Sequence, residues 1–291
     1  MALTDAQIAT YRNDGFLVVE DVLDTASLGR IRDVIADFKD RARSIAASNA
    51  IFDVGPGHSH ATPQLRRLKD PVDRHPVFEI LMRSDAIVSI VQDLLGPAVR
   101  FDHSKLNFKP AGGSAGIEWH QDWAFYPHTN DDLLAVGVMI EDCTPENGPL
   151  MVIPGSHRGP IYDHHANGIF VGGIRPADIG ADLERVVTLT APAGAISIHH
   201  VRTLHASGEN RSDRERPLLL YSYAAVDAFP VCEAMDLEAF DRRIVRGEPT
   251  LAPRATGVPM RLPYPRDEAA DSIFDNQAGM LADEPELEPV S

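Results

Sequence analysis

The segment Trp119-His120-Gln121-Asp122-Trp123 contains residue types that could bind a metal. His120 and Asp122 are two residues apart, so on a β-strand their side chains would point to the same face. One imidazole and one carboxylate on a single face are two of the three ligands of the 2-His-1-carboxylate site that holds non-haem iron. Alone the pair is weak evidence, because chance is expected to produce about one His-x-Asp in a chain of this composition.

A second segment could supply the third ligand and an anion-binding group. If residues 208–213 form the turn of a hairpin, His205 and Arg216 lie opposite each other as cross-strand neighbours. An arginine can hold a carboxylate through two parallel charge-assisted hydrogen bonds. A metal with two imidazoles, one carboxylate and open positions beside that arginine suits chelation of a keto acid such as 2-oxoglutarate. Arg214 is the nearest alternative anchor for the carboxylate.

These segments belong to a longer series of blocks that resembles the phytanoyl-CoA dioxygenase family of Fe(II)/2-oxoglutarate-dependent oxygenases. Each block is weak by itself, but their order and spacing over residues 3–225 are specific. The blocks are Leu3-Thr4-Asp5 with Tyr11 and Asp14-Gly15-Phe16-Leu17-Val18-Val19, then Trp119-His120-Gln121-Asp122, then Glu146-Asn147-Gly148-Pro149-Leu150 with Ile153-Pro154-Gly155-Ser156-His157, and finally His205, Ser207-Gly208, Asn210, Ser212 and Arg216.

The resemblance implies roles for six residues. It makes His120, Asp122 and His205 the iron ligands, and Arg216, Ser207 and Asn107 the residues that bind 2-oxoglutarate. With Fe(II), 2-oxoglutarate and O₂ such an enzyme hydroxylates an unactivated C–H bond of a small metabolite or natural-product intermediate, releasing succinate and CO₂. In related halogenases a small residue replaces the carboxylate ligand, so the intact Asp122 favours oxygenation.

Four further residues are candidate substrate contacts. On a strand over 99–109, His103 and Lys105 would share the face of Asn107, although a solvent-facing polar edge explains them equally well. Trp123 and Phe125 could form an aromatic wall over the substrate, or they could pack in the core. Arg66 and Arg67, which follow an irregular stretch over 50–66 that could be a lid, could grip an anionic substrate or be solvated.

The sequence leaves other outcomes of the same iron-dependent oxidation open, namely desaturation, epimerisation, cyclisation and endoperoxidation. A different class, a non-catalytic cupin-like sensor that binds a metal and a ligand, is less consistent with an intact Arg216. His157 is more typical of a loop-stabilising residue than of a ligand. Strand alternation sends His199 and His200 to opposite faces, so that one of them could support the metal ligands.

The elements that position these residues follow from local patterns. Thr4 and Gln7 form a capping box before a short helix that stops at Gly15, and a strand follows over 16–19. Asp24 or Thr25 opens a longer helix, and a third helix is expected over 76–95. Short strands are then expected at 99–109, 133–141, 150–153, 185–189, 195–199 and 218–225.

No helical pattern interrupts residues 99–225, which favours an antiparallel fold over parallel βαβ units. We therefore expect a mainly β (α+β) fold, a double-stranded β-helix or cupin-like jelly roll with the N-terminal helices packed on one sheet. A single domain is expected over 1–279, with a helical part at about 1–98, a jelly-roll core at about 99–225 and a C-terminal extension at 226–279. Residues 280–291 are expected to form a flexible acidic tail.

The composition of the chain limits the classes of molecule that the protein is expected to bind. The 291 residues carry a formal net charge of −16 and include four lysines, which argues against nucleic-acid and anionic-membrane binding. The distant cysteines Cys143 and Cys232 and the absence of a signal-like start favour a cytoplasmic protein. We expect a monomer or homodimer that binds a small molecule. Positive charge gathers in 100–109 and 197–216, so an anionic ligand is compatible with the acidic total.

Overall fold

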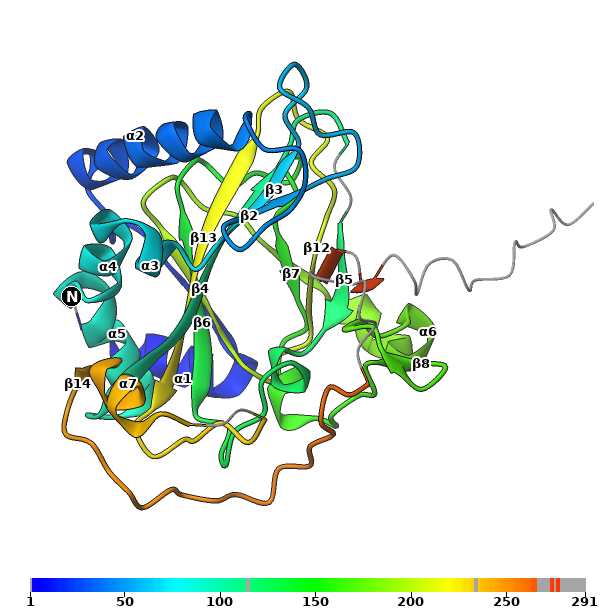
Figure 1. Ribbon diagram of the computed structural model, residues 1–291. Helices are drawn as coiled ribbons and strands as arrows, with labels where there is room; N and C mark the ends of the chain where they lie inside the picture. The colour runs from blue at the N-terminus through cyan, green and yellow to red at the C-terminus, as the bar shows by residue number, and fades with distance from the viewer. Residues whose placement is uncertain (1, 114–115, 233–234, 266–272, 275, 278–291) are drawn as a thin grey trace, which may run out of the picture.

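Two antiparallel sheets form the centre of the molecule in the computed structural model, which describes residues 2–113, 116–232, 235–265, 273–274 and 276–277 (Figure 1). The larger sheet has the strand order β1 (Phe16–Val19), β11 (Ile196–His200), β6 (Leu133–Met139), β13 (Arg216–Ala225), β4 (Val99–Lys109), β3 (Leu65–Lys69) and β2 (Phe52–Val54), and β14 (Ile244–Arg246) also pairs with β4. The smaller sheet has the order β10 (Val187–Leu189), β7 (Leu150–Val152), β12 (His205–Ser207) and β5 (Ile117–His120). This arrangement confirms the jelly-roll prediction.

Helices cover the outer face of the larger sheet, on the side away from β5, β7 and β12 (Figure 1). They are α1 (Asp5–Asp14), α2 (Thr25–Ala42), α3 (Pro71–Arg74), α4 (Pro76–Met82) and α5 (Asp85–Leu95). The Thr4–Gln7 capping box is present, and α2 begins after Asp24, whose side chain accepts from the Ser27 amide. The predicted helical face of α2, containing Leu28, Ile31, Ile35 and Phe38, is buried.

The core between these helices and the larger sheet connects β13 to α4. Tyr221 and Tyr223 on β13 are buried, and their hydroxyls donate to the carbonyls of Phe78 (2.8 Å) and Met82 (2.7 Å) on α4. Because both phenol groups are hydrogen-bonded, their burial leaves no unpaired polar atom. The opposite face of β13 is thereby held in place as one wall of the space between the sheets.

The register of β13 against β4 decides which polar residues face that space. Arg216 lies opposite Lys109, Leu218 opposite Asn107 and Leu220 opposite Lys105. Side chains on a strand alternate between faces, so this set shares one side of the sheet.

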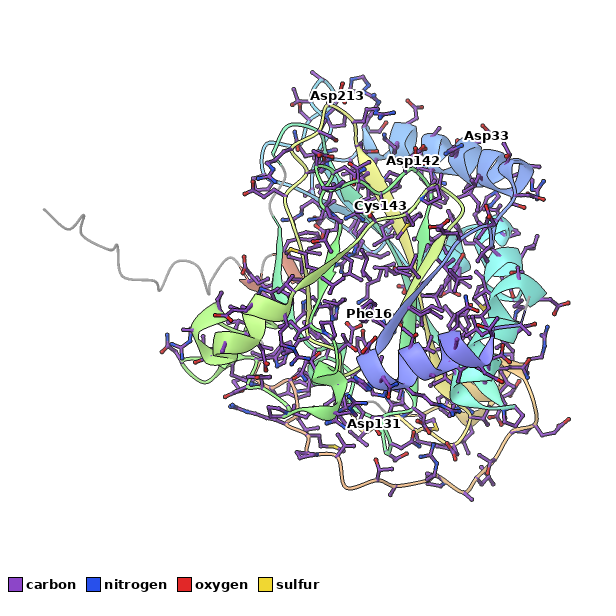
Figure 2. All side chains as sticks on the ribbon, turned by 180° about the vertical axis from the view of Figure 1, so that it is seen from behind. Phe16, Asp33, Asp131, Asp142, Cys143 and Asp213 are labelled. Carbon is purple, nitrogen blue, oxygen red and sulfur yellow. The ribbon has the colours of Figure 1, made fainter. Side chains whose placement is uncertain are left out.

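Figure 2 shows that Asp142, Cys143 and Asp213 lie at one end of the molecule, near α2, and Asp131 at the other.

Several local expectations differ from the structure. The predicted helix over 76–95 is broken at Arg83 and Ser84, where Ser84 becomes the residue that precedes α5. Residues 50–66 are not wholly irregular, since β2 and the start of β3 form a hairpin that extends the larger sheet. Short helices do interrupt the β region, namely η1 (Asp122–Ala124), η2 (Ser156–Arg158), α6 (Pro176–Ile179) and η3 (Gly180–Arg185).

The remaining elements are short. β8 (His165–Ala166) pairs with β9 (Ile169–Phe170), and α7 (Leu237–Arg242) precedes β14. The tail predicted at 280–291 lies outside the described residues. Within the described ranges, every helix is too short or too polar to cross a bilayer.

Candidate active site

The three predicted metal ligands meet between the two sheets. His120 is the last residue of β5 and is the register partner of His205, the first residue of β12. Asp122 begins η1 immediately after β5. One ligand atom from each of the three residues lies within 4.8 Å of the others, and all three residues are buried. This spacing suits a single divalent cation bound by two imidazoles and one carboxylate.

A tight turn, and not strand alternation, brings Asp122 to His120. The chain leaves the strand at Gln121, whose side chain is 0% exposed. Its amide group donates to the carbonyls of Pro160 (3.1 Å) and Arg202 (2.9 Å), and its oxygen accepts from the amide of Tyr162 (3.0 Å). Because every polar atom of this side chain is used, the turn between the two ligands is fixed.

Main-chain carbonyls orient the two imidazole rings. The Nδ1 atom of His120 lies 2.7 Å from the Glu118 carbonyl, and that of His205 lies 2.9 Å from the Thr203 carbonyl. A proton on each Nδ1 leaves the lone pair on Nε2 free for a metal. His199 contacts the Asp122 carboxylate, with 3.1 Å between its Nε2 and Oδ2 of Asp122.

The ionisation of the three groups favours a cation. Burial lowers the pKa of His120 to about 4 and lowers the pKa of His205 well below its usual value. Burial alone would raise the pKa of Asp122, but the His199 hydrogen bond and the nearby His205 and Lys105 hold it well below its usual value. At neutral pH the site therefore offers two neutral imidazoles and one carboxylate.

A cation-lined end of the same cavity fits the distal carboxylate of 2-oxoglutarate. Arg216 is 4% exposed, and its guanidinium donates to the carbonyls of Asn147 (3.3 Å) and Gly148. The buried hydroxyl of Ser207 has no hydrogen-bond partner among the described residues. Among the described residues, Arg216 forms no ion pair with a carboxylate, and the unpaired Ser207 hydroxyl lines the same cavity. These two groups are the donors that the carboxylate of a bound ligand would require.

The expected pairing of His205 with Arg216 is wrong. β12 lies in the smaller sheet and pairs with β5 and β7, whereas β13 lies in the larger sheet and pairs with β4 and β6. Residues 208–215 cross from one sheet to the other and do not form a two-stranded hairpin. Both side chains still line one cavity, because the two sheets face each other across it.

Asn107 and Lys105 also line this cavity, on the face that the alternation of β4 predicted. The Asn107 side-chain oxygen accepts from Nε of Arg67 at 2.9 Å, so Asn107 also orients a cation. The Lys105 ammonium lies 5.5 Å from the centre of the Tyr126 ring. Arg67 and Lys105 thus form a second positive region of the cavity, in addition to the Arg216 end.

Three other predicted contacts lie outside the residues that line the cavity. His103 is bound through Nδ1 to Asp102 (2.7 Å) and through Nε2 to the Ser222 hydroxyl (3.2 Å). Trp123 is 1% exposed and packs in an apolar cluster with its indole N–H on the Pro259 carbonyl (2.9 Å). Phe125 packs edge-on against His120, with ring centres 5.7 Å apart, and against Phe170.

The sequence did not point to Ser222 or Phe274, which line the cavity together with Tyr126 and Lys109. Burial and the nearby Asp122 carboxylate raise the pKa of the Tyr126 hydroxyl well above the usual value. Lys109 has the same strand parity as Lys105 and Asn107, which was a usable signal. Tyr126 belongs to the aromatic residues that follow Asp122, which also favoured a place beside the substrate, whereas Phe274 carries no such signal because its place depends on the C-terminal segment.

Two other histidines, His157 and His164, are held by main-chain groups. His157 lies 3.2 Å from the Arg12 carbonyl through Nε2 and packs beside His200. The Nε2 atom of His164 accepts a hydrogen bond from the main-chain N–H of Gln121 (2.9 Å). His164 therefore supports the turn between His120 and Asp122. His199 faces the site and His200 does not, as strand alternation predicted.

Comparison with known proteins identifies the family. The sequence profile described as phytanoyl-CoA dioxygenase (PhyH) matches residues 11–218. The chain belongs to the phytanoyl-CoA dioxygenase family. A probable alpha-ketoglutarate-dependent hypophosphite dioxygenase of Stutzerimonas stutzeri is 35% identical, over 93% of this chain and 96% of that protein. L-proline trans-4-hydroxylase of Streptomyces griseoviridis is 30% identical, over 78% and 88% respectively.

Solved structures of other proteins have the same fold as this chain. EctD from S. alaskensis with bound Fe superposes with a TM-score of 0.68 at 23% identity, covering 89% of this chain and 88% of that one. This member of the phytanoyl-CoA dioxygenase family is a 2-oxoglutarate-dependent non-haem iron dioxygenase, and its cavity carries the donor groups that both iron and 2-oxoglutarate require.

Proposed function

We propose that this dioxygenase hydroxylates a small oxyanion, with hypophosphite as the first candidate. His120, Asp122 and His205 hold the iron, and Arg216 and Ser207 bind the distal carboxylate of 2-oxoglutarate. Lys105 and Arg67 bind the substrate anion. The observation that carries the proposal is that two half-buried cations, Lys105 and Arg67, line the cavity that contains the proposed metal ligands.

The charges of Lys105 and Arg67 are not balanced by ion pairs. Within the described residues, neither side chain forms a salt bridge with a carboxylate, and Arg67 is bonded to the neutral Asn107. Burial lowers the pKa of both groups, so both would gain from an anionic ligand. Even a half-buried cation without an ion-pair partner is stabilised when a ligand supplies the opposite charge.

The charge of the cavity wall also argues against an amino-acid substrate. Asp122 is the sole acidic side chain among the described residues that line the cavity, and it is assigned to the metal. A zwitterion such as proline would place its ammonium near Lys105 and Arg67 with no carboxylate to receive it.

The printed name of the S. stutzeri relative supports hypophosphite as the first candidate. In the proposed reaction one oxygen atom of O₂ enters a P–H bond to give phosphite. The other oxidises 2-oxoglutarate to succinate and CO₂, so that atoms and electrons balance. The bound iron would supply the oxidation chemistry. Lys105 and Arg67 would orient the oxyanion, and the apolar walls at Leu150 and Leu218 would exclude water.

The test is succinate release from the Fe(II)-loaded protein with candidate substrates. Hypophosphite is expected to stimulate release and to yield phosphite in a phosphorus NMR spectrum, whereas L-proline and ectoine are expected to have no effect. Lys105→Met should raise the hypophosphite concentration needed for half-maximal turnover at least about tenfold, because a charge-assisted contact is lost. Lys39→Met, on α2, is the matched lysine control.

The opposite outcomes are informative. Stimulation by a zwitterion and not by an oxyanion would contradict the substrate class, and product mass would separate hydroxylation from desaturation, epimerisation, cyclisation or endoperoxidation. Tight oxyanion binding without succinate from any substrate would favour a sensor.

We also propose a cytoplasmic location, because Cys143 forms no disulfide and Fe(II) requires a reducing compartment. A monomer or homodimer is expected by light scattering.

A further inference from the structure

The C-terminal segment reaches the cavity that contains the proposed metal ligands. Ile273 and Phe274 line this cavity together with residues of both sheets, and Figure 1 shows this part of the chain in red beside β5. The family profile matches residues 11–218, so both residues lie outside the part of the chain that it covers. Their place in the cavity is therefore a feature that the family match does not explain.

Gln277 fastens this segment to the strand that carries His120. Its side chain is buried, with its amide group donating to the Gly172 carbonyl (2.9 Å) and its oxygen accepting from the main-chain N–H of Glu118 (3.0 Å). β5 is the outermost strand of the smaller sheet, and the Glu118 carbonyl lies 2.7 Å from Nδ1 of His120. The segment is thus bonded to the residue whose carbonyl orients His120.

Phe274 covers two cations that belong to the larger sheet. Its ring centre lies 5.1 Å from the guanidinium carbon of Arg66 and 5.6 Å from that of Arg67. Arg66 pairs with Asp53 at 2.7 Å, and Arg67 donates to Asn107 at 2.9 Å, so other side chains also hold both guanidinium groups. The face of an aromatic ring attracts a cation at such distances, and the ring is therefore held against Arg67.

These contacts join the two sheets across one side of the cavity. Gln277 holds the segment to the smaller sheet, and Phe274 lies on arginines of the larger sheet. The phenyl ring therefore occupies room beside Arg67, where the substrate anion is proposed to bind. An aromatic side chain in such a place excludes larger substrates by steric conflict.

We propose that Phe274 is a specificity-determining residue, which restricts the cavity beside Arg67 to compact substrates, and that Gln277 is the positioning residue that holds it there. The size limit rests on the proposed function, because that function places the substrate anion at Arg67. The attachment of the segment to β5 does not depend on the substrate, so the two parts can be tested separately.

Turnover of three anions of increasing size tests the size limit. Hypophosphite, methylphosphinate and phenylphosphinate each contain a P–H bond, and insertion of oxygen would give phosphite, methylphosphonate and phenylphosphonate while 2-oxoglutarate is oxidised to succinate and CO₂. The unmodified protein should favour hypophosphite. Phe274→Ala should raise kcat/KM for phenylphosphinate, relative to that for hypophosphite, at least about tenfold, because loss of the ring opens room beside Arg67.

A matched control separates this effect from a general loss of packing. Phe240 lies over the guanidinium of Arg100 at 3.3 Å, outside the residues that line the cavity, and is half-buried like Phe274. Phe240→Ala should therefore leave the ratio of the two kcat/KM values unchanged. A ratio measured on one preparation is also insensitive to partial unfolding, because the unfolded fraction lowers both values equally.

Hydrogen exchange tests the attachment of the segment without any substrate. In the Mn(II)-loaded protein, Gln277→Ala should speed exchange of the Glu118 amide at least about threefold, because this amide loses its acceptor. The same change should shift the anion ratio in the direction of Phe274→Ala. Gln92→Ala, which removes a side-chain hydrogen bond on α5, should change neither.

The outcomes distinguish the size limit from the proposed function. If the unmodified protein converts hypophosphite, an unchanged anion ratio in Phe274→Ala would refute the size limit and leave the proposed function intact. If the unmodified protein converts none of the three anions, the proposed function fails and the size limit at Arg67 fails with it. Unchanged exchange of the Glu118 amide in Gln277→Ala would refute the positioning role in either case.

Discussion

Neighbouring groups orient the proposed metal ligands and set their ionisation states. Carbonyls fix the rings of His120 and His205, and His199 holds the Asp122 carboxylate. These partners also set the ionisation states, so a divalent ion enters a site with two neutral imidazoles and one negative charge.

Removing an imidazole ligand should abolish the reaction. We expect His120→Ala or His205→Ala to lower succinate release at least about 100-fold, because even the outer partners of metal ligands cost about 10–100-fold when removed. Bound iron, measured by atomic emission, should fall in parallel. His60→Ala, at an exposed loop position, should retain both. Full turnover in either ligand variant would show that the triad is misassigned.

Arg216 should act on the cosubstrate and not on iron. Its guanidinium is buried at the end of the cavity, whereas the Arg214 side chain is 89% exposed. Arg216→Ala should raise the 2-oxoglutarate requirement at least about tenfold with little change in iron affinity, since a charge-assisted contact is lost. Arg214→Ala is the matched control. The reverse pattern would move the anchor to Arg214.

At the scale of elements, the junction of α1 and β1 supports the strand that carries His205. Gly15 ends α1 with a φ of +81°, and its carbonyl accepts from the His200 amide (2.9 Å) and the Thr203 hydroxyl (2.9 Å). A Cβ on Gly15 would collide with the ring of His157 and lie 2.8 Å from the Thr203 hydroxyl oxygen. The first helix is therefore connected to the segment that leads into β12.

Gly15→Ala should lower the free energy of unfolding by at least about 1 kcal/mol, since a left-handed conformation strains an L residue. Gly29→Ala is the matched control, because it lies within α2 with no atom near the added Cβ. That change should raise the free energy of unfolding by about 0.5–1 kcal/mol. Urea unfolding measures both, and equal effects would contradict the role of Gly15.

Over the whole molecule, the buried histidines make stability depend on pH. Burial lowers the pKa of His164 and of His200 to about 3 in the folded protein, against about 6.5 when unfolded. Below pH 6.5 the unfolded chain binds more protons, so the free energy of unfolding falls as the pH falls toward 3. The loss approaches about 1.4 kcal/mol per pH unit for each histidine.

The metal-free protein should therefore unfold at a lower urea concentration at pH 5 than at pH 7.5. His164→Gln, which keeps an acceptor for the Gln121 amide, should reduce this difference by about 2 kcal/mol. His60→Gln should leave it unchanged. A pH difference that is the same in both variants would assign the acid sensitivity to other groups.

The sequence by itself predicted the elements that local patterns control. The cap at Thr4, the buried face of α2 and the exact span of β4 follow from interactions between near neighbours along the chain. The sequence also placed the candidate ligands and Arg216 in the segments that now line one cavity, because their residue types and spacing resemble those of one family. Strand alternation likewise placed Lys105 and Asn107 on the cavity face.

Only the tertiary structure decided which distant segments meet. The His205–Arg216 pairing failed because the chain changes sheets over 208–215, and a strand pattern contains no information about which sheet receives the strand. Trp123 could not be separated from a cavity residue, because burial in a core and beside a ligand need the same apolar side chain. The pairing of Lys109 with Arg216 arises from register alone, which is set by contacts across the whole sheet.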